Sequence, residues 1–264
     1  MPSQLLFLGT GGDANLTAKG IRKSGGLILN VNEVQIHIDP GPGGLQESAV
    51  RGQDPQNTSL IIASHEHTNH SHDANAIIAY TSKNGTDKKC TVIGSESVTK
   101  NIPENIAGWC KSVNTMIPGK KILFEEFEIL PIKAIHNDPS ATGIQIFTPE
   151  LIIGYTGDTK FDKSMSEEFE GADILIMNTK HLMGEKSATN LTTNDAIKMV
   201  GLVKPKLAIM THFSTKFHEA NPLYEAREVQ RKTEVQTIAA VDGLSIDPNS
   251  YSAKLRTKTL NLFK

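Results

Sequence analysis

The segment ASHEHTNHSHD, residues 63–73, places four histidines in eleven positions directly after the apolar run SLII. His65 and His67 lie two positions apart, so their rings point to one side of an extended segment. Asn69 and His70 follow where the chain is expected to turn into a helix, and they can face the same crevice from another angle. Because imidazole is a frequent metal ligand, this spacing predicts a metal site.

Three more side chains with ligand chemistry lie at the ends of apolar runs. His136 directly follows the run FEILPIKAI, Asp158 follows LIIGYTG, and His212 follows KLAIMT. Loops at the carboxyl ends of strands gather in one crevice of an α/β sheet, so these groups can meet His65 in space. A lone histidine is usually a surface or hydrogen-bonding residue, but this set supplies ligands for one or two ions of Zn²⁺, Mn²⁺ or Fe²⁺. Two ions would clamp the attacking and leaving oxygens of a hydrolysis.

The composition is that of a globular protein without a strong electrostatic bias. Of the 264 residues, 38% are hydrophobic and 21% are charged, and the net charge is −2. A field this weak would not draw the chain to nucleic acid or to an anionic membrane, and no run of about 18 apolar residues predicts a membrane span. The start, MPSQLLFLGTGG, has no basic segment, and Cys90 and Cys110 form no CxxC motif. We therefore expect a cytoplasmic protein with reduced thiols.

The expected secondary structure indicates one domain over residues 1–264, with strands first and then alternating strands and helices. Strands are predicted over residues 4–9, 25–31, 34–39, 59–64, 90–95, 127–135, 142–148, 151–158, 172–179 and 206–212, and a strand followed by a turn over residues 235–246. Helices are predicted over residues 72–83, 192–203 and 222–233. The basic tail over residues 250–264 is expected to be peripheral.

The chain resembles the metallo-β-lactamase fold superfamily over nearly its whole length. The resemblance rests on the segments FLGTGGD, GGLILNVNEVQIHIDPGPG, SHEHTNH, IHNDPSATG, YTGDT and MTHFS, which occur in the order typical of that family. Its most specific part is the similarity to the H-x-H-x-D-H motif, followed by His, Asp and His on later strands. The resemblance implies an α/β fold, a four-layer αββα sandwich of two mixed β-sheets flanked by helices, with metals along one sheet edge.

The resemblance also implies roles for the candidate ligands. One ion would be held by His65, His67 and His136, and a second ion by His70, Asp158 and His212. Asp158 would bridge the two ions, and a hydroxide bound between them would be the nucleophile of a metal-dependent hydrolase. Zinc is the expected cofactor, as one or two ions, with Mn²⁺ or Fe²⁺ as alternatives.

Asn69 departs from the family motif, in which this position is an aspartate that binds the second metal. Its amide oxygen can still be a neutral ligand, but it brings no negative charge and cannot act as a base. We expect the second metal site to be weakened and hydrolysis to be slowed. His72 and Asp73 either compensate or begin the next helix. Asp39 in HIDPG matches an acidic position that supports the family's site, whereas His37 is interpreted as structural.

Within the superfamily, the opening FLGTGG and the block NLTTNDAIKMVGLVKPKLAIMTHFS are most similar to the phosphodiesterase branch, which includes ribonuclease Z. Members of this branch typically carry a histidine near the scissile phosphate, where this chain has Asn190. His181, nine residues earlier, is a candidate substitute as general acid, and a loop residue is the alternative interpretation. The long arm with which ribonuclease Z grips tRNA is not apparent. A small phosphodiester is therefore favoured over folded RNA as the substrate.

Two other functions stay open from the sequence. The same metals can polarise the carbonyl of a lactone, thioester or β-lactam, a reaction in which the leaving group needs less help than in phosphodiester cleavage. Asn69 and Asn190 together also fit a degenerate member that binds metal without turnover. A homodimer is one way of covering the apolar face of the segment AIKMVGLV, and no membrane partner is expected.

Overall fold

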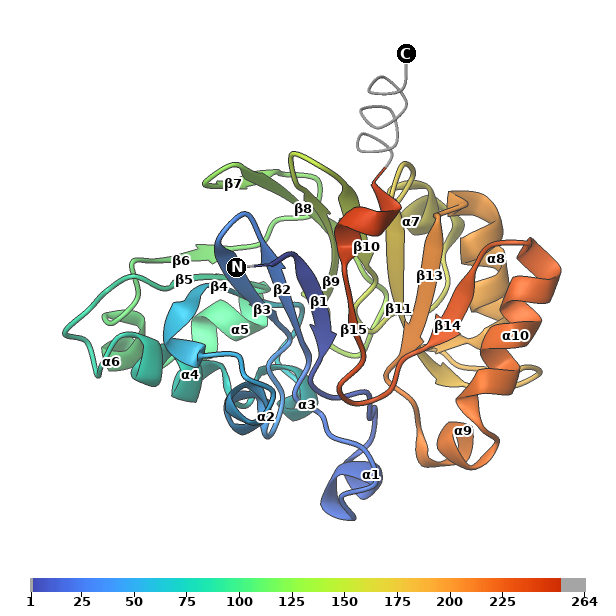
Figure 1. The fold of residues 1–264 in the computed structure, drawn as a ribbon, viewed down its shortest axis with the longest axis horizontal. Coiled ribbons are helices and arrows are strands. Elements are labelled where there is room, and N and C mark those ends of the chain that lie inside the picture. Colours follow the sequence, from blue (N-terminus) through green and yellow to red (C-terminus); the bar gives the residue numbers. More distant parts are fainter. Residues whose placement is uncertain (1, 253–264) are drawn as a thin grey trace. The chain divides into compact units, whose positions relative to one another are not determined.

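Two mixed β-sheets organise the computed structural model of this chain, which describes residues 2–252 (Figure 1). The chain divides into two units, each built on one sheet. The first unit contains the residues up to Ile117 together with Asp138–Thr142 and Val241–Ile246. The second contains Pro118–Asn137, Gly143–Ala240 and residues 247–252.

The first unit has a seven-stranded sheet in the order β15-β1-β2-β3-β4-β5-β6. Its strands are β1 (Gln4–Phe7), β2 (Leu27–Val31), β3 (Val34–Ile38), β4 (Thr58–Ala63), β5 (Thr91–Gly94), β6 (Ser112–Thr115) and β15 (Ser245–Ile246). Its helices are α1 (Ala14–Ala18), α2 (Gly44–Val50), α3 (Thr68–Ser71), α4 (Ala74–Thr81), α5 (Glu96–Asn101) and α6 (Glu104–Ala107). Because β3, β4 and β5 are parallel neighbours, the loops at their carboxyl ends lie at one edge of this sheet.

Burial of apolar side chains explains why these segments form strands and helices. Ile61 on β4 packs against Ile77 and Ile78 of α4 in one buried cluster, so the helix covers this part of the sheet. Both cysteines, Cys90 and Cys110, are buried free thiols in the same cluster, as expected. Burying such aliphatic side chains contributes roughly 1.5–3 kcal/mol each, which stabilises the strands that carry the polar residues at their ends.

The second unit has an eight-stranded sheet in the order β14-β13-β11-β10-β9-β8-β7, with β12 paired to β11. Its strands are β7 (Ile122–Phe124), β8 (Phe127–Lys133), β9 (Thr142–Phe147), β10 (Ile152–Tyr155), β11 (Ile174–His181), β12 (Leu191–Thr192), β13 (Leu207–Thr211) and β14 (Thr237–Ala239). Its helices are α7 (Lys163–Glu167), α8 (Thr193–Val203), α9 (Thr215–Glu219) and α10 (Pro222–Thr233). Strands β10, β11, β13 and β14 run parallel, so their carboxyl ends also share one edge.

The start of α8 shows how local sequence fixes a boundary in this unit. Thr192 and Asp195 form a reciprocal capping box, in which each side chain satisfies a backbone N–H of the first turn. Inside the helix, Ala196, Met199 and Val200 recur at helical spacing and are buried in the core of the unit. The predicted helix over residues 192–203 is therefore observed with almost the same limits.

Most predicted elements are observed, and the differences are short helices, the short strands β6, β7 and β12, and the segment over residues 235–246. Helix α2, with its mixed sequence GLQESAV, was not predicted. The segment 235–246, expected as one strand and a turn, contains two short strands, β14 and β15, in different sheets. The tail prediction falls mostly outside the described residues, because the description ends at Ser252. No helix among residues 2–252 is both long and apolar enough to cross a membrane.

Candidate metal centre

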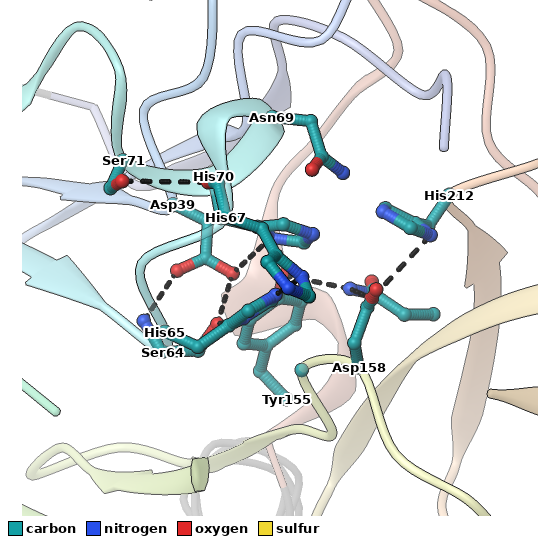
Figure 2. A network of polar contacts seen from close by, with 12 residues as sticks. Asp39, Ser64, His65, His67, Asn69, His70, Ser71, Tyr155, Asp158 and His212 are labelled. Carbon is teal, nitrogen blue, oxygen red and sulfur yellow. Dashed lines mark hydrogen bonds and ion pairs between the residues drawn. The ribbon is translucent and has the colours of Figure 1, made fainter. Parts of the chain in front are cut away.

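In the first unit, Asp39 stands at the centre of a buried hydrogen-bond network at the carboxyl ends of β3 and β4 (Figure 2). Its carboxylate accepts from the backbone N–H and the Oγ of Ser64, both at 2.6 Å. Nδ1 of His70 lies 2.8 Å from the same carboxylate and, because the carboxylate can only accept, carries the shared proton. This contact leaves Nε2 of His70 as the nitrogen that would bind a metal.

The charge state of Asp39 follows from these partners. Burial by itself would raise the pKa of the Asp39 carboxyl, but the neighbouring His70 and the hydrogen bond from Ser64 hold the pKa below its usual value. The backbone of Asp39 has φ of +51°, in the left-handed region that non-glycine residues rarely adopt. Asp39 is therefore an ionised, fixed acceptor that orients His70, in agreement with the supporting role expected for it.

The tautomer of His65 follows from the same network. Ser64 gives its only hydroxyl proton to Asp39, so its Oγ accepts from Nδ1–H of His65 at 3.0 Å. Nε2 of His65 therefore carries the lone pair, and it lies 2.9 Å from Nδ1 of His67. Ligand atoms of Asp39, His65 and His70 lie within 4.8 Å of one another. The first unit thus brings His65, His67 and His70 together, as the spacing predicted.

Asn69 is half-buried on α3, where the neighbouring loop fixes its backbone. Its carbonyl oxygen accepts from Oγ of Ser24 at 3.2 Å. A Cβ on Gly41 would lie 2.2 Å from that same oxygen, so this position of the PGPG loop has room only for glycine. His72 is exposed, whereas Asp73 begins α4 and accepts from the N–H of Leu45 at 3.1 Å. Asp73 therefore has the structural role that was one of the two expectations.

A second carboxylate, Asp138, fastens the loop between His65 and His67. It accepts from the N–H of Glu66 at 3.2 Å, from Oγ of Ser97 at 2.5 Å, and from the N–H and Oγ of Ser140 at 2.8 and 2.7 Å. Burial would raise the pKa of Asp138, but the hydrogen bonds from these serines and from Glu66 lower it to about 2. An ionised Asp138 therefore ties the H-x-H turn to α5.

In the second unit, Asp158 is the centre of the corresponding cluster. Asn178 donates its amide to Oδ1 of Asp158 at 2.8 Å and also to Oη of Tyr155 at 3.1 Å. Asn190 donates its amide to Oδ2 of Asp158 at 3.0 Å. Asp158, Asn178 and Asn190 are all buried. Each oxygen of this carboxylate is therefore held by one amide, which fixes its plane.

Two histidines flank Asp158 in the same unit. Nδ1 of His212 lies 3.4 Å from Oδ1 of Asp158, a contact drawn in Figure 2, and Nε2 of His136 lies 3.8 Å from Oδ2. His136 donates from Nδ1 to the carbonyl oxygen of Thr189 at 2.7 Å, which directs Nε2 toward Asp158. His212 follows β13 with φ of +65°, again in the left-handed region. The second unit thus brings His136, Asp158 and His212 together.

His181 is the last residue of β11 and not a loop residue. The loop interpretation assumed that the strand ends earlier, but pairing with Thr192 of β12 extends it. Nδ1 of His181 lies 3.6 Å from the carboxylate of Glu185. Burial lowers the pKa of His181, and the charge of Glu185 offsets this effect only in part. His181 is therefore a largely neutral imidazole at neutral pH.

His37 is completely buried on β3 and takes no part in either cluster. It faces Ile28 of β2 and Ile61 of β4 in the register of the sheet. Among the described residues, neither ring nitrogen has a hydrogen-bond partner. Burial lowers the pKa of His37 to about 3, so the ring is neutral and acts as an apolar core group, in agreement with the structural interpretation.

The donor sets of both units suit divalent cations. Buried imidazole nitrogens and carboxylate oxygens with fixed second partners are the chemistry of Zn²⁺, Fe²⁺ and Mn²⁺ sites. The sequence did not single out Ser64, Asn178 or Asp138. Asn178 could have been recognised from the sequence, because it is a polar residue near the end of the apolar run ADILIMNT, like the predicted ligands on other strands. For Asp138 no local signal exists, since its partners are distant in sequence.

Comparison with known proteins agrees with this geometry. The family described as "Beta-lactamase superfamily domain" matches residues 35–213. An uncharacterized protein from Methanocaldococcus jannaschii is 30% identical over 256 residues, which cover 94% of this chain and 96% of the relative. The metallo-beta-lactamase fold protein YhfI from Bacillus subtilis superposes with a TM-score of 0.78 at 18% identity, and the superposition covers 93% of this chain and 99% of that chain. The short form of human tRNase Z superposes with a TM-score of 0.71 at 15% identity, and the superposition covers 92% of this chain and 98% of that chain.

The structural matches bear on the fold alone, because their sequences have diverged far. They confirm the predicted fold class, the αββα sandwich with two mixed β-sheets flanked by helices. The family match includes His65, His136, Asp158 and His212, the strand-end residues from which the metal site was predicted.

Proposed function

Since this chain belongs to the β-lactamase superfamily, we propose that it is a dinuclear metal-dependent hydrolase that cleaves a phosphodiester bond. The observation that carries the proposal is the fixed orientation of two buried imidazoles. Asp39 holds Nδ1 of His70, and the carbonyl of Thr189 holds Nδ1 of His136. In both rings Nε2 is therefore the nitrogen aimed at a metal position, as in other carboxylate- or carbonyl-supported histidine ligands.

The ligands proposed for the two ions are those that the family resemblance implies. The first ion would bind His65, His67 and His136, and the second would bind His70, Asp158 and His212, with Asn69 as a neutral ligand. Asp158 would lie between the ions. Zinc is the proposed metal, and Mn²⁺ or Fe²⁺ would suit the same nitrogen and oxygen donors.

When bound, such cations lower the pKa of water and draw charge from a phosphoryl oxygen. The chain's own residues fix the geometry for that chemistry. Asn178 and Asn190 hold the plane of the Asp158 carboxylate, and Asp39 keeps His70 in one tautomer. Asp138 holds the turn that carries His67. These contacts restrict the ligands before substrate arrives, so less reorganisation is needed during the reaction.

A phosphodiester is the proposed substrate because of the phosphodiesterase-like sequence blocks and the structural likeness to a tRNase Z. A carbonyl ester or lactone is the second candidate, and one observation favours it. Asn190 occupies the position of the phosphodiesterase histidine and donates to Asp158, so it supplies no proton to a leaving group. The two candidates differ in how much help the leaving group requires.

The test is metal content per chain by elemental analysis, followed by turnover of bis(p-nitrophenyl) phosphate, a lactone and nitrocefin with the reconstituted protein. Two ions per chain and preferential phosphodiester turnover would support the proposal. One ion with turnover of the lactone or nitrocefin alone would favour the carbonyl alternative. Correctly folded protein without tightly held metal would overturn the site, and two ions without any turnover would indicate a binding protein.

A further inference from the structure

The second unit has a groove beside α7, α8 and α10, formed by two hollows of about 470 and 550 Å³. Both hollows are lined by Phe161 and Lys198, so they adjoin each other. Each has the volume of a site for one small ligand. Together they form a longer depression, which suits a chain-like ligand better than a single small molecule.

The groove is strongly basic although the chain as a whole is not. The two hollows are lined by six lysines, namely Lys160, Lys163, Lys186, Lys198, Lys204 and Lys232, and by two acidic residues, Glu185 and Asp195. Both acids already have lysine partners, Lys216 for Glu185 and Lys198 for Asp195. Lys160, Lys186, Lys204 and Lys232 are exposed and form no salt bridge within residues 2–252, although Lys160 helps to lower the pKa of nearby Asp162 and Lys232 that of Glu228. These contacts offset part of the positive charge, and the excess of lysine over acidic residues in the lining leaves a net positive groove that would attract a polyanion.

Phe161 gives the groove an aromatic surface at its middle. Its ring is half-buried, packs against the core of the unit on one side, and lines both hollows. Nζ of Lys198 lies 4.9 Å from the centre of this ring. Lysines that follow a backbone, together with an aromatic ring that can stack on a base, are the features of single-strand nucleic acid sites. Inside a duplex both faces of a base are covered by its stacked neighbours, so an unstacked base of a single strand suits Phe161.

Hydrogen bonds connect one wall of the groove to the Asp158 cluster of the same unit. Ser187, which lines the groove, accepts through Oγ from the N–H of Asn190 at 3.0 Å, and Asn190 donates to Asp158. Lys160 is two residues beyond Asp158, and its N–H donates to the carbonyl of Ile135 at 2.8 Å, next to His136. The groove wall and the Asp158 cluster are therefore neighbours within the second unit, so one strand could contact both.

We infer that this groove binds a single-stranded polynucleotide that leads to or from the metal site, so that the substrate is a nucleic acid strand and not a small phosphodiester. The inference rests on the proposed phosphodiesterase function and identifies its substrate class. It departs from the expectation drawn from the net charge of −2, because that total does not reveal a local excess of lysine.

The test compares two fourfold variants of the full chain. The groove variant carries Lys→Gln at positions 160, 186, 204 and 232, and the matched control carries Lys→Gln at the exposed residues Lys83, Lys88, Lys89 and Lys111 of the first unit. Binding of fluorescein-labelled oligouridylate and oligothymidylate is measured by anisotropy over a series of salt concentrations. Turnover of bis(p-nitrophenyl) phosphate is measured with the same preparations, and an oligoglutamate of equal length is the polyanion control.

We expect the groove variant to bind both oligonucleotides at least tenfold more weakly. The slope of the logarithm of the binding constant against the logarithm of the salt concentration should be shallower by about 3, because each lost phosphate contact to a single strand removes about 0.7 from it. The control variant should bind like the unaltered chain. Phe161→Leu should weaken oligonucleotide binding roughly tenfold and leave any binding of oligoglutamate unchanged, because only bases stack on the ring. A preference for oligouridylate over oligothymidylate would identify RNA as the strand.

Equal losses in both variants, or no loss in either, would overturn the groove assignment. So would tight binding of oligoglutamate that depends on the same lysines, because the site would then recognise acidic protein. Turnover of bis(p-nitrophenyl) phosphate shows whether the groove assignment or the proposed phosphodiesterase function has failed. Failed turnover with groove-dependent binding would refute the phosphodiesterase proposal alone, and preserved turnover with groove-independent binding would refute the groove alone.

Discussion

Asn190 donates its side-chain amide to Oδ2 of Asp158 at 3.0 Å, while Asn178 holds the other oxygen of the same carboxylate at 2.8 Å. An amide can neither carry a charge nor transfer a proton under these conditions. The residue at position 190 therefore orients a proposed metal ligand, at a position where the resemblance to the phosphodiesterase branch implies a histidine near the substrate. This relationship gives the first prediction.

Replacing Asn190 by alanine should lower zinc affinity by 10- to 100-fold, because it removes a hydrogen bond that fixes a ligand carboxylate. The measurement is a competition titration with a chromophoric zinc chelator. Asn105→Ala, at an exposed position of α6, is the matched control and should leave the affinity unchanged. Unaltered affinity in the Asn190 variant, with a normal unfolding temperature, would show that Asp158 is not positioned by this contact.

Asn69→Asp should tighten binding of the second ion and increase the hydrolytic rate. A carboxylate adds the negative charge that the amide lacks, and charged oxygen ligands bind divalent cations more strongly. Stoichiometry by elemental analysis and the rate with bis(p-nitrophenyl) phosphate test both parts. If both quantities fall, Asn69 is adapted to a different metal or a different reaction.

His67→Ala and His136→Ala should each reduce metal content and abolish activity, because each removes a proposed ligand of the first ion. His72→Ala is the control within the same segment, since His72 is exposed. Elemental analysis and thermal unfolding, with and without chelator, are the measurements. Full metal content in either ligand variant, or an equal loss in the His72 variant, would contradict the ligand assignment.

His181→Ala should leave turnover of bis(p-nitrophenyl) phosphate unchanged, because nitrophenolate departs without a proton. If His181 is the general acid, the variant will lose about 10²–10⁴-fold with a dialkyl or ribonucleotide phosphodiester. Its pH–rate profile should then lose the limb that reflects the lowered pKa of this imidazole. Equal rates with both classes of leaving group would exclude His181 from the reaction.

His37 should make the chain less stable in mildly acidic solution. Its pKa is about 3 in the folded chain and about 6.5 when unfolded, so between these values the unfolded chain binds a proton that the folded chain does not. Stability is therefore lost as the pH falls below about 6.5, at up to about 1.4 kcal/mol per pH unit. His37→Leu should remove roughly 1.4 kcal/mol of the difference between pH 7.5 and 5.5, as measured by urea unfolding. An identical pH dependence in this variant would contradict the buried neutral state.

The sequence alone determined the chemical types and the strand-end positions of the candidate ligands. Hydrophobic runs and glycine turns are local signals, so they predicted the strands before His65, Asp158 and His212 and the helix α8. The motif order was sufficient for the fold class, because the resemblance extends over nearly the whole chain. Short helices such as α2 were missed, since their weak periodicity forms a helix only through packing.

Only the tertiary structure decided which partners hold the ligands. Asp39 meets His70 across 31 positions of sequence, and Asp158 meets Asn190 across 32. The left-handed backbones of Asp39 and His212 likewise follow from surrounding contacts, because the local preference of these residues opposes them. The lysines of the groove come together from positions 160 to 232, although no basic run marks them in the sequence. Local sequence encodes elements and residue types, whereas the pairing of distant side chains arises only when the sheets and helices pack.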